Sequence, residues 1–202
     1  MLGICVPVRD TLHSGFAYCL SQLTAHLVSS GVEFKLYFEN GSMISDQRYR
    51  LVMSAKSDNC TQILWLDSDM LFPVSIYSKL NKHKKLVTAG TYSTRTKPYR
   101  NTAFTSSKFD ISDHKTGLHQ TYAVGMGLML TDIRVFDKIP RPWFKVVWSN
   151  KLDTFIGEDI YFCEQLNTYE IDLWVDYDLS NHCGHIGTTA IKMENINDAN
   201  SI

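Results

Sequence analysis

The sequence lacks any hydrophobic run that approaches the ~20 residues needed to cross a bilayer. It also lacks an excess of charge of either sign, because 20 basic and 21 acidic side chains leave a formal net charge of −1 and a pI near 6.6. Such a balance argues against a protein that coats nucleic acid or lies on an anionic membrane surface. We therefore expect no nucleic-acid partner and no membrane span.

Paired cysteines are absent as well. The five cysteines are odd in number, scattered along the chain and without a C-x-x-C pair, which indicates reduced thiols. The first residues, 1–8, are typical of a core strand, and no basic segment precedes them as in a secretory signal peptide. Together these features predict a cytoplasmic protein.

Internal repeats, linkers and low-complexity tracts are not found either. The 202 residues suit one compact domain, because dividing them would leave each half short of core. With 44% hydrophobic and 20% charged residues, the composition is that of a soluble globular protein. We expect a single domain over residues 1–190, followed by a polar tail over 191–202.

The first ninety residues alternate between segments of strand length and segments of helical periodicity. Strands are expected at 3–8, 33–38, 62–67 and 85–90, with helices starting near Ser14, Ser45 and Pro73. This order is typical of a mainly parallel sheet covered by helices on both faces.

After Gly90 the pattern changes. Residues 91–120 are polar and predict a surface excursion with a hairpin near 114–117. Later residues return to the core, with strands at 122–130 and 172–176 and helices at 132–138 and 158–167. The whole predicts an α/β domain with a smaller antiparallel excursion.

Two carboxylates, Asp67 and Asp69, follow the apolar strand at 62–67. Ligands of open parallel sheets bind at the carboxyl ends of the strands. Two hard oxygen ligands at that edge suit Mg²⁺ or Mn²⁺, which share the rest of their shell with water and substrate phosphates. The alternative is that Asp67 caps the following turn and Asp69 is a solvated surface charge.

A second acidic pair, Glu158 and Asp159, follows Gly157 at the start of a helix with an apolar face. Carboxylates in the first turn are favoured by the helix dipole, so ordinary capping explains them. A carboxylate fixed there can also take a proton from an attacking hydroxyl, and the two roles are compatible.

Two further segments carry candidate ligands. His182 and His185 flank Cys183 in a glycine-punctuated loop; a zinc site is disfavoured because no second cysteine lies nearby, whereas one imidazole can complete an oxygen-rich Mn²⁺ shell. Gly125 and Gly127 interrupt a predicted strand, which indicates close approach of either a ligand or a neighbouring helix.

In this order, the motifs resemble the small GT-A glycosyltransferases, particularly the compact ones encoded by phages and large DNA viruses. The resemblance extends from Ile4 to about Thr188, and its most specific stretches are 63–70, 124–130 with 142–144, 157–163 and 182–187. It implies a Rossmann-like GT-A fold, a nucleoside-diphosphate sugar donor with UDP favoured over GDP, Mn²⁺ or Mg²⁺, and a hydroxyl acceptor on a carbohydrate or glycoconjugate. A viral member would work in the host cytoplasm.

The resemblance also assigns roles to residues of this chain. It implies metal ligation by Asp69, Asp67 and His185, with His182 the less favoured histidine. It implies that the nucleotide contacts Pro7, Val8, Arg9, Arg48, Asp67 and Ser68.

For the reacting groups, the resemblance implies a sugar pocket at Gly125, Met126 and Gly127. Asp159 would be the base of an inverting enzyme, with Glu158 orienting the acceptor. In a retaining enzyme Asp159 would instead contact the sugar or the acceptor, and the residues do not distinguish the two outcomes.

The polar excursion and the region after it add further candidates. Tyr92, Lys97 and Arg100 would lie in a mobile wall over the substrates, although the two cations equally fit a solvated basic face. Trp143 and Trp148 are candidates for an aromatic platform under an acceptor sugar.

Three other functions share parts of this pattern. A sugar-phosphate nucleotidyltransferase needs a glycine-rich basic loop after the first strand, but residues 8–15 hold one arginine and one glycine. A haloacid-dehalogenase-type phosphohydrolase has its aspartates after the first strand rather than the third. A non-catalytic nucleotide-sugar or carbohydrate-binding module is disfavoured by the intact Asp67, Asp69, Asp159 and His185.

Overall fold

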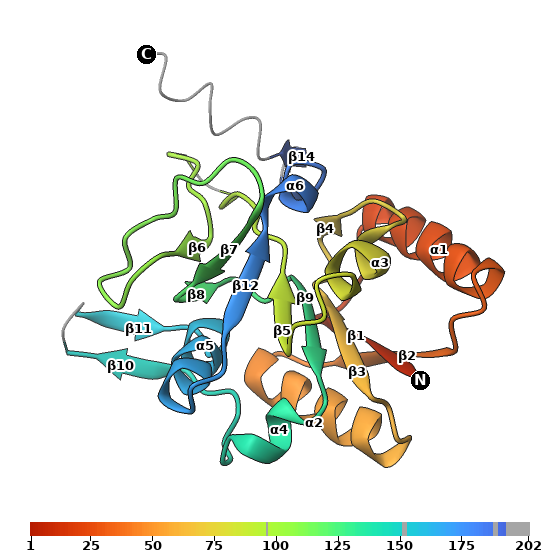
Figure 1. The fold of residues 1–202 in the computed structure, drawn as a ribbon, viewed down its shortest axis with the longest axis horizontal. Helices are drawn as coiled ribbons and strands as arrows, with labels where there is room; N and C mark the ends of the chain where they lie inside the picture. Colours follow the sequence, from red (N-terminus) through yellow and green to blue (C-terminus); the bar gives the residue numbers. More distant parts are fainter. Residues whose placement is uncertain (96, 151–152, 188–189, 193–202) are drawn as a thin grey trace.

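The computed structural model describes residues 1–95, 97–150, 153–187 and 190–192. Its centre is a seven-stranded sheet in the order β2-β1-β3-β9-β5-β12-β7 (Figure 1). Five strands run parallel, namely β1 (Leu2–Val8), β2 (Phe34–Asn40), β3 (Gln62–Leu66), β5 (Val87–Ala89) and β12 (Leu173–Asp176). Two strands run antiparallel to them, β9 (Leu128–Asp132) between β3 and β5, and β7 (Leu118–Thr121) at the edge beside β12.

Helices cover both faces of the sheet. One face carries α1 (Ser14–Ser29) and α3 (Ile76–Asn81), and the other carries α2 (Ile44–Ser57), α4 (Val135–Lys138) and α5 (Glu158–Thr168). The short α6 (Tyr177–Ser180) follows β12 directly. This is the expected mixed α/β domain with a mostly parallel sheet.

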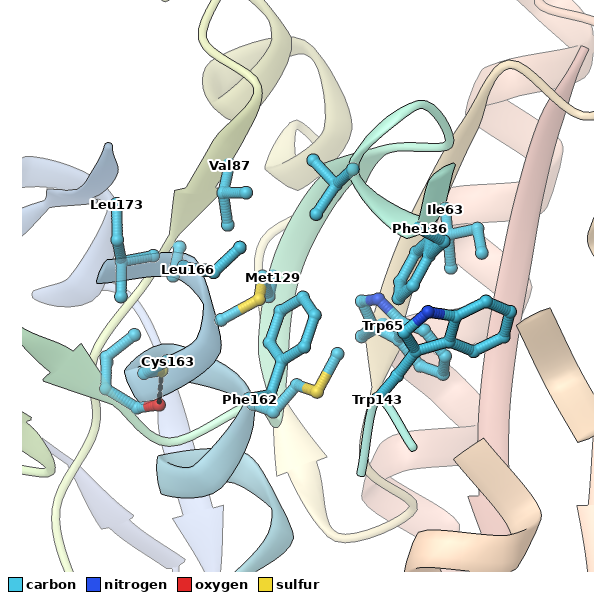
Figure 2. Close-up of a cluster of buried hydrophobic side chains, with 14 of the residues drawn as sticks. Ile63, Trp65, Val87, Met129, Phe136, Trp143, Phe162, Cys163, Leu166 and Leu173 are labelled. Carbon is cyan, nitrogen blue, oxygen red and sulfur yellow. Dashed lines mark hydrogen bonds between the residues drawn. The ribbon is translucent and has the colours of Figure 1, made fainter. Parts of the chain in front are cut away.

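Each face of the sheet has its own hydrophobic core because side chains alternate along the strands. In β3, Ile63 and Trp65 pack with the helices α2, α4 and α5, whereas Leu64 and Leu66 pack with α1 and α3. All four are fully buried, which explains why β3 reads as a continuous apolar run. Figure 2 shows the first core, in which the rings of Trp65 and Phe136 meet edge to face at 6.4 Å.

Small antiparallel sheets lie outside the main sheet. β4 (Met70–Leu71) pairs with β13 (Gly184–Ile186), which in turn pairs with β14 (Ala190–Lys192). β6 (Ala103–Phe104) pairs with β8 (Ala123–Val124), and β10 (Val147–Ser149) forms a hairpin with β11 (Thr154–Ile156). Small antiparallel sheets were expected, but of these strands only β6 lies within the excursion expected at 91–120.

Several local expectations were wrong. The single strand expected at 122–130 is two strands, β8 and β9, separated by a turn at Met126 and Gly127. No hairpin turns at 114–117, because β6 pairs with β8 while β7 pairs with β12. These pairings join segments far apart in sequence, which local patterns do not reveal.

Helix starts also shifted. α2 begins at Ile44 after the N-cap Met43, so Ser45 and Asp46 lie inside its first turn rather than capping it. α3 begins at Ile76, three residues after Pro73. Residues 193–202 of the expected polar tail lie outside the described residues.

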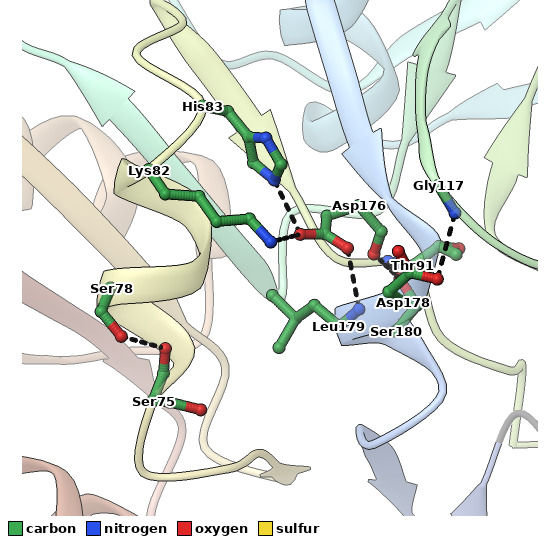
Figure 3. Close-up of polar contacts among 10 residues, drawn as sticks. All are labelled: Ser75, Ser78, Lys82, His83, Thr91, Gly117, Asp176, Asp178, Leu179 and Ser180. Carbon is green, nitrogen blue, oxygen red and sulfur yellow. Dashed lines mark hydrogen bonds and ion pairs between the residues drawn. The ribbon is translucent and has the colours of Figure 1, made fainter.

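A polar network joins the end of β12 to the end of β5 (Figure 3). The carboxylate of Asp176 accepts a hydrogen bond from the Leu179 backbone amide at 2.8 Å and lies 2.7 Å from His83 Nε2. Ser180 Oγ donates to the Asp176 carbonyl at 2.6 Å and accepts from the Thr91 amide at 2.9 Å. This network fixes the chain just before Tyr92.

Trp143 lies in the core rather than at a substrate surface. Its side chain is 2% exposed, its Nε1 donates to the Ile139 carbonyl at 3.1 Å, and its ring lies 5.2 Å from that of Phe136. The expectation that Trp143 contacts an acceptor sugar is therefore wrong.

Two other expectations concern the whole chain. All five cysteines are free, as the sequence predicted. In the described part of the chain, no helix combines the length and the apolar character that crossing a membrane requires.

Substitutions of the buried Trp143 and the exposed Trp148 test how much core packing stabilises the fold. Replacing Trp143 with alanine should lower the free energy of unfolding by about 3–5 kcal/mol, because a large side chain leaves a cavity in the packed core. Trp148 is 50% exposed on β10 and is the matched control; its replacement with alanine should cost less than about 1 kcal/mol. Urea unfolding followed by circular dichroism measures both, and similar losses for the two variants would contradict the packing described.

Candidate active site

The candidate site lies at the carboxyl ends of β1, β3 and β5. The chain leaves β3 through Asp67, Ser68 and Asp69, and it leaves β5 toward Tyr92. Because these three strands are parallel, their ends meet at one edge of the sheet. The helix α5 brings Glu158 and Asp159 to the same edge.

A buried guanidinium joins the first aspartate to the start of α5. Arg48 of α2 is 1% exposed; its Nη2 donates to Asp67 Oδ1 at 2.9 Å and its Nε donates to Glu158 Oε1 at 3.0 Å. The guanidinium also lies over the Trp65 ring, 5.6 Å from the centroid. Its Nη1 has no hydrogen-bond partner among the described residues.

This arrangement corrects two expectations. Arg48 was expected to face the nucleotide, but it is buried beneath the site, where it pairs with both carboxylates, and it presents almost no surface to a ligand. Glu158 was expected to orient the acceptor, but its carboxylate points to Arg48 and its exposed fraction is 8%. Burial raises the pKa of Asp67, while the charge of Arg48 opposes that shift.

The second aspartate meets the late histidine. The strands β4 and β13 pair antiparallel with His185 opposite Met70, and the Ile186 amide donates to the Asp69 carbonyl at 2.8 Å. As a result, Asp69 Oδ2 lies 3.4 Å from His185 Nε2. His182 is exposed and its amide bonds the Leu179 carbonyl, so the structure brings His185 and not His182 to Asp69.

The orientation of the imidazole is fixed from behind. His185 Nδ1 lies 3.0 Å from the Ser93 carbonyl, and since a carbonyl only accepts, Nδ1 carries a hydrogen. Nε2 then faces Asp69, and Asp69 Oδ2 accepts a hydrogen bond from Arg95 Nη1 at 2.7 Å. Burial raises the pKa of Asp69, but His185 and Arg95 outweigh it and the net pKa is lowered.

Asp69 and His185 can supply two of the ligands of a metal ion, but not a complete coordination shell. Within the described residues, no group of three or more His, Cys, Asp or Glu side chains is placed to hold a metal ion. Asp69 and His185 offer one carboxylate and one imidazole held in place by Ser93, and Asp67 is engaged by Arg48 instead. Two protein ligands fit a cation that takes its other ligands from water and substrate phosphates.

The two glycines make room for a tyrosine. The Gly127 amide donates to the Tyr92 hydroxyl at 3.0 Å, and a Cβ added at Gly125 or Gly127 would lie 2.5 or 2.8 Å from that oxygen. The group that approaches Gly125 and Gly127 closely is therefore the Tyr92 side chain, from the segment after β5, and not a neighbouring helix. Met126 between them is fully buried in the core, so the expectation that it contacts the sugar is wrong.

Asp159 differs from the other carboxylates of the site. Its Oδ1 accepts a hydrogen bond from the Ile160 amide at 2.8 Å, and a Cβ added at Gly157 would lie 2.7 Å from the same oxygen. Burial, and next the charge of Glu158, raise the pKa of Asp159 to about 6. A carboxyl with such a pKa can accept a proton near neutral pH.

Two pockets adjoin at this edge. The first, of about 320 Å³, contains Asp67 and Asp69 and is also lined by Pro7, Arg9, Ser68, Gly41, Ser42, Ile44 and Gln47. Val8 is not in the lining; it is 5% exposed and its carbonyl accepts from Gln47 Nε2 at 2.5 Å.

Sequence reasoning missed the contribution of residues 41–47 to this pocket. It assigned no binding role to the segment between the expected strand at 33–38 and Ser45, although β2 ends at Asn40 beside the end of β1. Since β1 and β2 are parallel, the loop after β2 had to lie at the same edge as Pro7 and Arg9.

The second pocket, of about 610 Å³, contains Asp159 and Gly125 and is also lined by Thr94, Arg100, Asn101, Thr102, Phe104, Phe109, Ile111 and Ile160. Tyr92, Arg95 and His185 line both pockets and form the partition between them. Lys97 is exposed and lines neither of these pockets.

Comparison with known proteins shows the fold. No family model matches the chain, and no curated protein matches its sequence. Solved structures do match: A197 from STIV has a TM-score of 0.63 and 17% identity, covering 92% of this chain and 85% of that one. A Drosophila β-1,4-galactosyltransferase 7, in complex with manganese, UDP-Gal and xylobiose, has a TM-score of 0.53 and 15% identity, covering 95% of this chain and 70% of that one. The chain has the GT-A glycosyltransferase fold.

The raised pKa of Asp159 predicts a cost in stability. The unfolded carboxyl loses its proton near pH 4 and the native one near pH 6, so the folded state loses stability as the pH rises between these values. Asp159→Asn removes this loss, and the variant should be about 1–3 kcal/mol more stable than the wild type at pH 7.5, with little difference at pH 4.

Urea unfolding at the two pH values measures this difference. Asp153→Asn, which removes an exposed carboxylate, controls for the change in net charge. If the Asp159→Asn variant is no more stable than the wild type at pH 7.5, the ionised Asp159 carboxylate does not destabilise the folded state and the raised pKa is contradicted.

Proposed function

We propose that the protein is a glycosyltransferase that moves a sugar from a nucleoside-diphosphate sugar, UDP-sugar favoured over GDP-sugar, to a hydroxyl group of a carbohydrate acceptor. The observation that carries this proposal is the pair of adjoining pockets, one with Asp69 and His185 and the other with Asp159. They share a partition, so a group bound in one can reach a group bound in the other. The GT-A fold supports the same conclusion.

The first pocket suits the nucleotide diphosphate. Its lining combines the ends of β1 and β2 with the Asp67–Asp69 turn and places the guanidinium of Arg95 beside the carboxylate of Asp69. The galactosyltransferase with a similar fold was solved with manganese and UDP-Gal, which favours a uridine nucleotide and manganese here as well.

Asp69 and His185 would hold the cation, Mn²⁺ or Mg²⁺. A bound cation would neutralise the negative charge that grows on the departing nucleoside diphosphate. Ser93 contributes from behind by keeping Nε2 of His185 turned toward Asp69. Arg95 occupies Asp69 in the structure, and it would be released toward the donor phosphates when a cation takes its place.

Asp159 would be the general base of the transfer. The acceptor hydroxyl gives its proton to the Asp159 carboxylate as its oxygen bonds to the sugar C1. The bond from C1 to the diphosphate oxygen breaks, and its electron pair leaves with the nucleoside diphosphate. The Ile160 amide keeps the carboxylate oriented, and a pKa of about 6 leaves it mostly ionised at pH 7 yet basic enough to accept a proton.

Two substitutions separate donor binding from transfer. In calorimetric titrations, UDP should bind in the presence of Mn²⁺ and at least about tenfold more weakly to Asp69→Asn. Asp159→Asn should bind UDP as the wild type does but transfer sugar at least about a hundredfold more slowly, because the proton acceptor is lost. The control is Asp172→Asn, an exposed carboxylate outside both pockets.

Other outcomes point elsewhere. Binding of UDP that does not depend on Mn²⁺ or on Asp69 would contradict the metal assignment. Metal-dependent binding without turnover of any donor would instead indicate a nucleotide-sugar-binding module. Full activity of Asp159→Asn would remove its role as base.

The ion pair between Arg95 and Asp69 predicts opposite effects on the two ligands. In Arg95→Ala, Mn²⁺ alone should bind about fivefold more tightly, because no guanidinium competes for the Asp69 carboxylate. UDP should bind more weakly at saturating Mn²⁺, because a partner of its phosphates is lost. Calorimetry measures both, with Lys97→Ala as the control from the same segment; unchanged Mn²⁺ affinity would contradict the competition.

A further inference from the structure

The second pocket has a wall that the polar sequence of this region does not suggest. Phe104, Phe109 and Ile111 line one part of it, and Ile160 of α5 lies in the same lining. The rings of Phe104 and Phe109 meet edge to face at 5.5 Å. Apolar rings of this kind pack against the C–H faces of sugar rings and other flat ligands.

Phe109 is held in place at an energetic cost. Its φ of +59° lies in the left-handed region, which is unfavourable for a bulky residue. The loop enforces it through the Phe109 amide, which donates to the Ser106 carbonyl at 2.9 Å, and through Ser106 Oγ, which donates to Asp110 Oδ2 at 2.6 Å. The bridge between Phe104 and Ile111 closes the loop and brings its apolar side chains together.

The charges of this pocket are mainly positive. Arg95 and Arg100 both line it, whereas Asp159 supplies the one carboxylate among the described lining residues. Arg95 is paired with Asp69 in the partition. Arg100 is exposed, and its guanidinium forms no ion pair with any residue in the described ranges. A guanidinium in this situation binds carboxylates and sulfates through two parallel hydrogen bonds.

We propose that the acceptor is an anionic sugar, whose ring covers the wall of Phe104 and Phe109 and whose acidic group pairs with Arg100. This inference rests on the proposed transferase function and names the class of its acceptor. The shared chemistry is a pyranose ring with one anionic substituent, which a uronic acid or a sulfated sugar supplies. The hydroxyl that reacts is the one that then reaches Asp159 from the same pocket.

Binding of matched methyl glycosides tests the proposal directly. Methyl glucoside, methyl glucuronide and methyl glucoside 6-sulfate, with the corresponding galactosides, are titrated into the protein with UDP and Mn²⁺ present. The tightest acidic glycoside should bind at least about tenfold more tightly than the tightest neutral one. The uronide and sulfate arms then distinguish the two sources of the charge.

Variants assign this preference to the residues named. Arg100→Ala should abolish the advantage of acidic glycosides and leave the affinity for neutral ones and for UDP unchanged, whereas Arg100→Lys should keep part of it. Lys97→Ala is the matched control, because Lys97 is an exposed cation of the same segment that does not line the pocket. Phe109→Leu should weaken acidic and neutral glycosides alike, while Phe155→Leu, at an exposed ring on β11, should change neither.

The results separate this proposal from the function on which it rests. Failure of UDP and Mn²⁺ to bind would contradict the proposed function. With that binding intact, equal affinity for neutral and acidic glycosides, binding of neither, or an acidic preference that survives Arg100→Ala would overturn the acceptor proposal.

Discussion

The site depends on one buried cation. The guanidinium of Arg48 lies between Asp67 at the end of β3 and Glu158 at the start of α5, and it has almost no exposure to solvent. A guanidinium buried in this way is costly unless carboxylates pair with it, so removing Asp67 or Glu158 would leave the buried charge of Arg48 less well compensated. Because Asp67 begins the turn that carries Asp69, and Glu158 precedes Asp159, this triad fixes the distance between the two halves of the site.

The carboxylates of the site differ in their cationic partners and in their pKa values. Arg48 pairs with both Asp67 and Glu158, and Arg95 pairs with Asp69. Asp159 has no direct cationic partner among the described residues, and burial together with the charge of Glu158 raises its pKa to about 6. The surroundings of Asp69 and Asp159 thus shift their pKa values in opposite directions.

Sequence reasoning predicted what depends on local pattern. The apolar run of β3 predicted a buried strand, and its end placed Asp67 and Asp69 at the ligand edge, where the structure has them. It failed where the outcome depends on distant partners. The position of Arg48 depends on its hydrogen bond to Glu158, 110 residues away, and that of Trp143 depends on the core in which it packs. The position of Phe109 depends on a left-handed backbone conformation that no short sequence motif predicts. The local sequence around such residues does not show whether they will be buried or exposed in the folded protein.

The partition formed by Tyr92, Arg95 and His185 gives the two pockets a common boundary. The segment from Thr91 to Thr102 starts at the Asp176 and Ser180 network, so its first residues are fixed while Arg95 further on is exposed. Arg95 donates a hydrogen bond to the Asp69 carboxylate in the first pocket and also lines the second pocket. In the proposed function, a cation that takes the place of Arg95 at Asp69 would release this guanidinium, and because Arg95 lines both pockets, the change at the first pocket would alter the lining of the second.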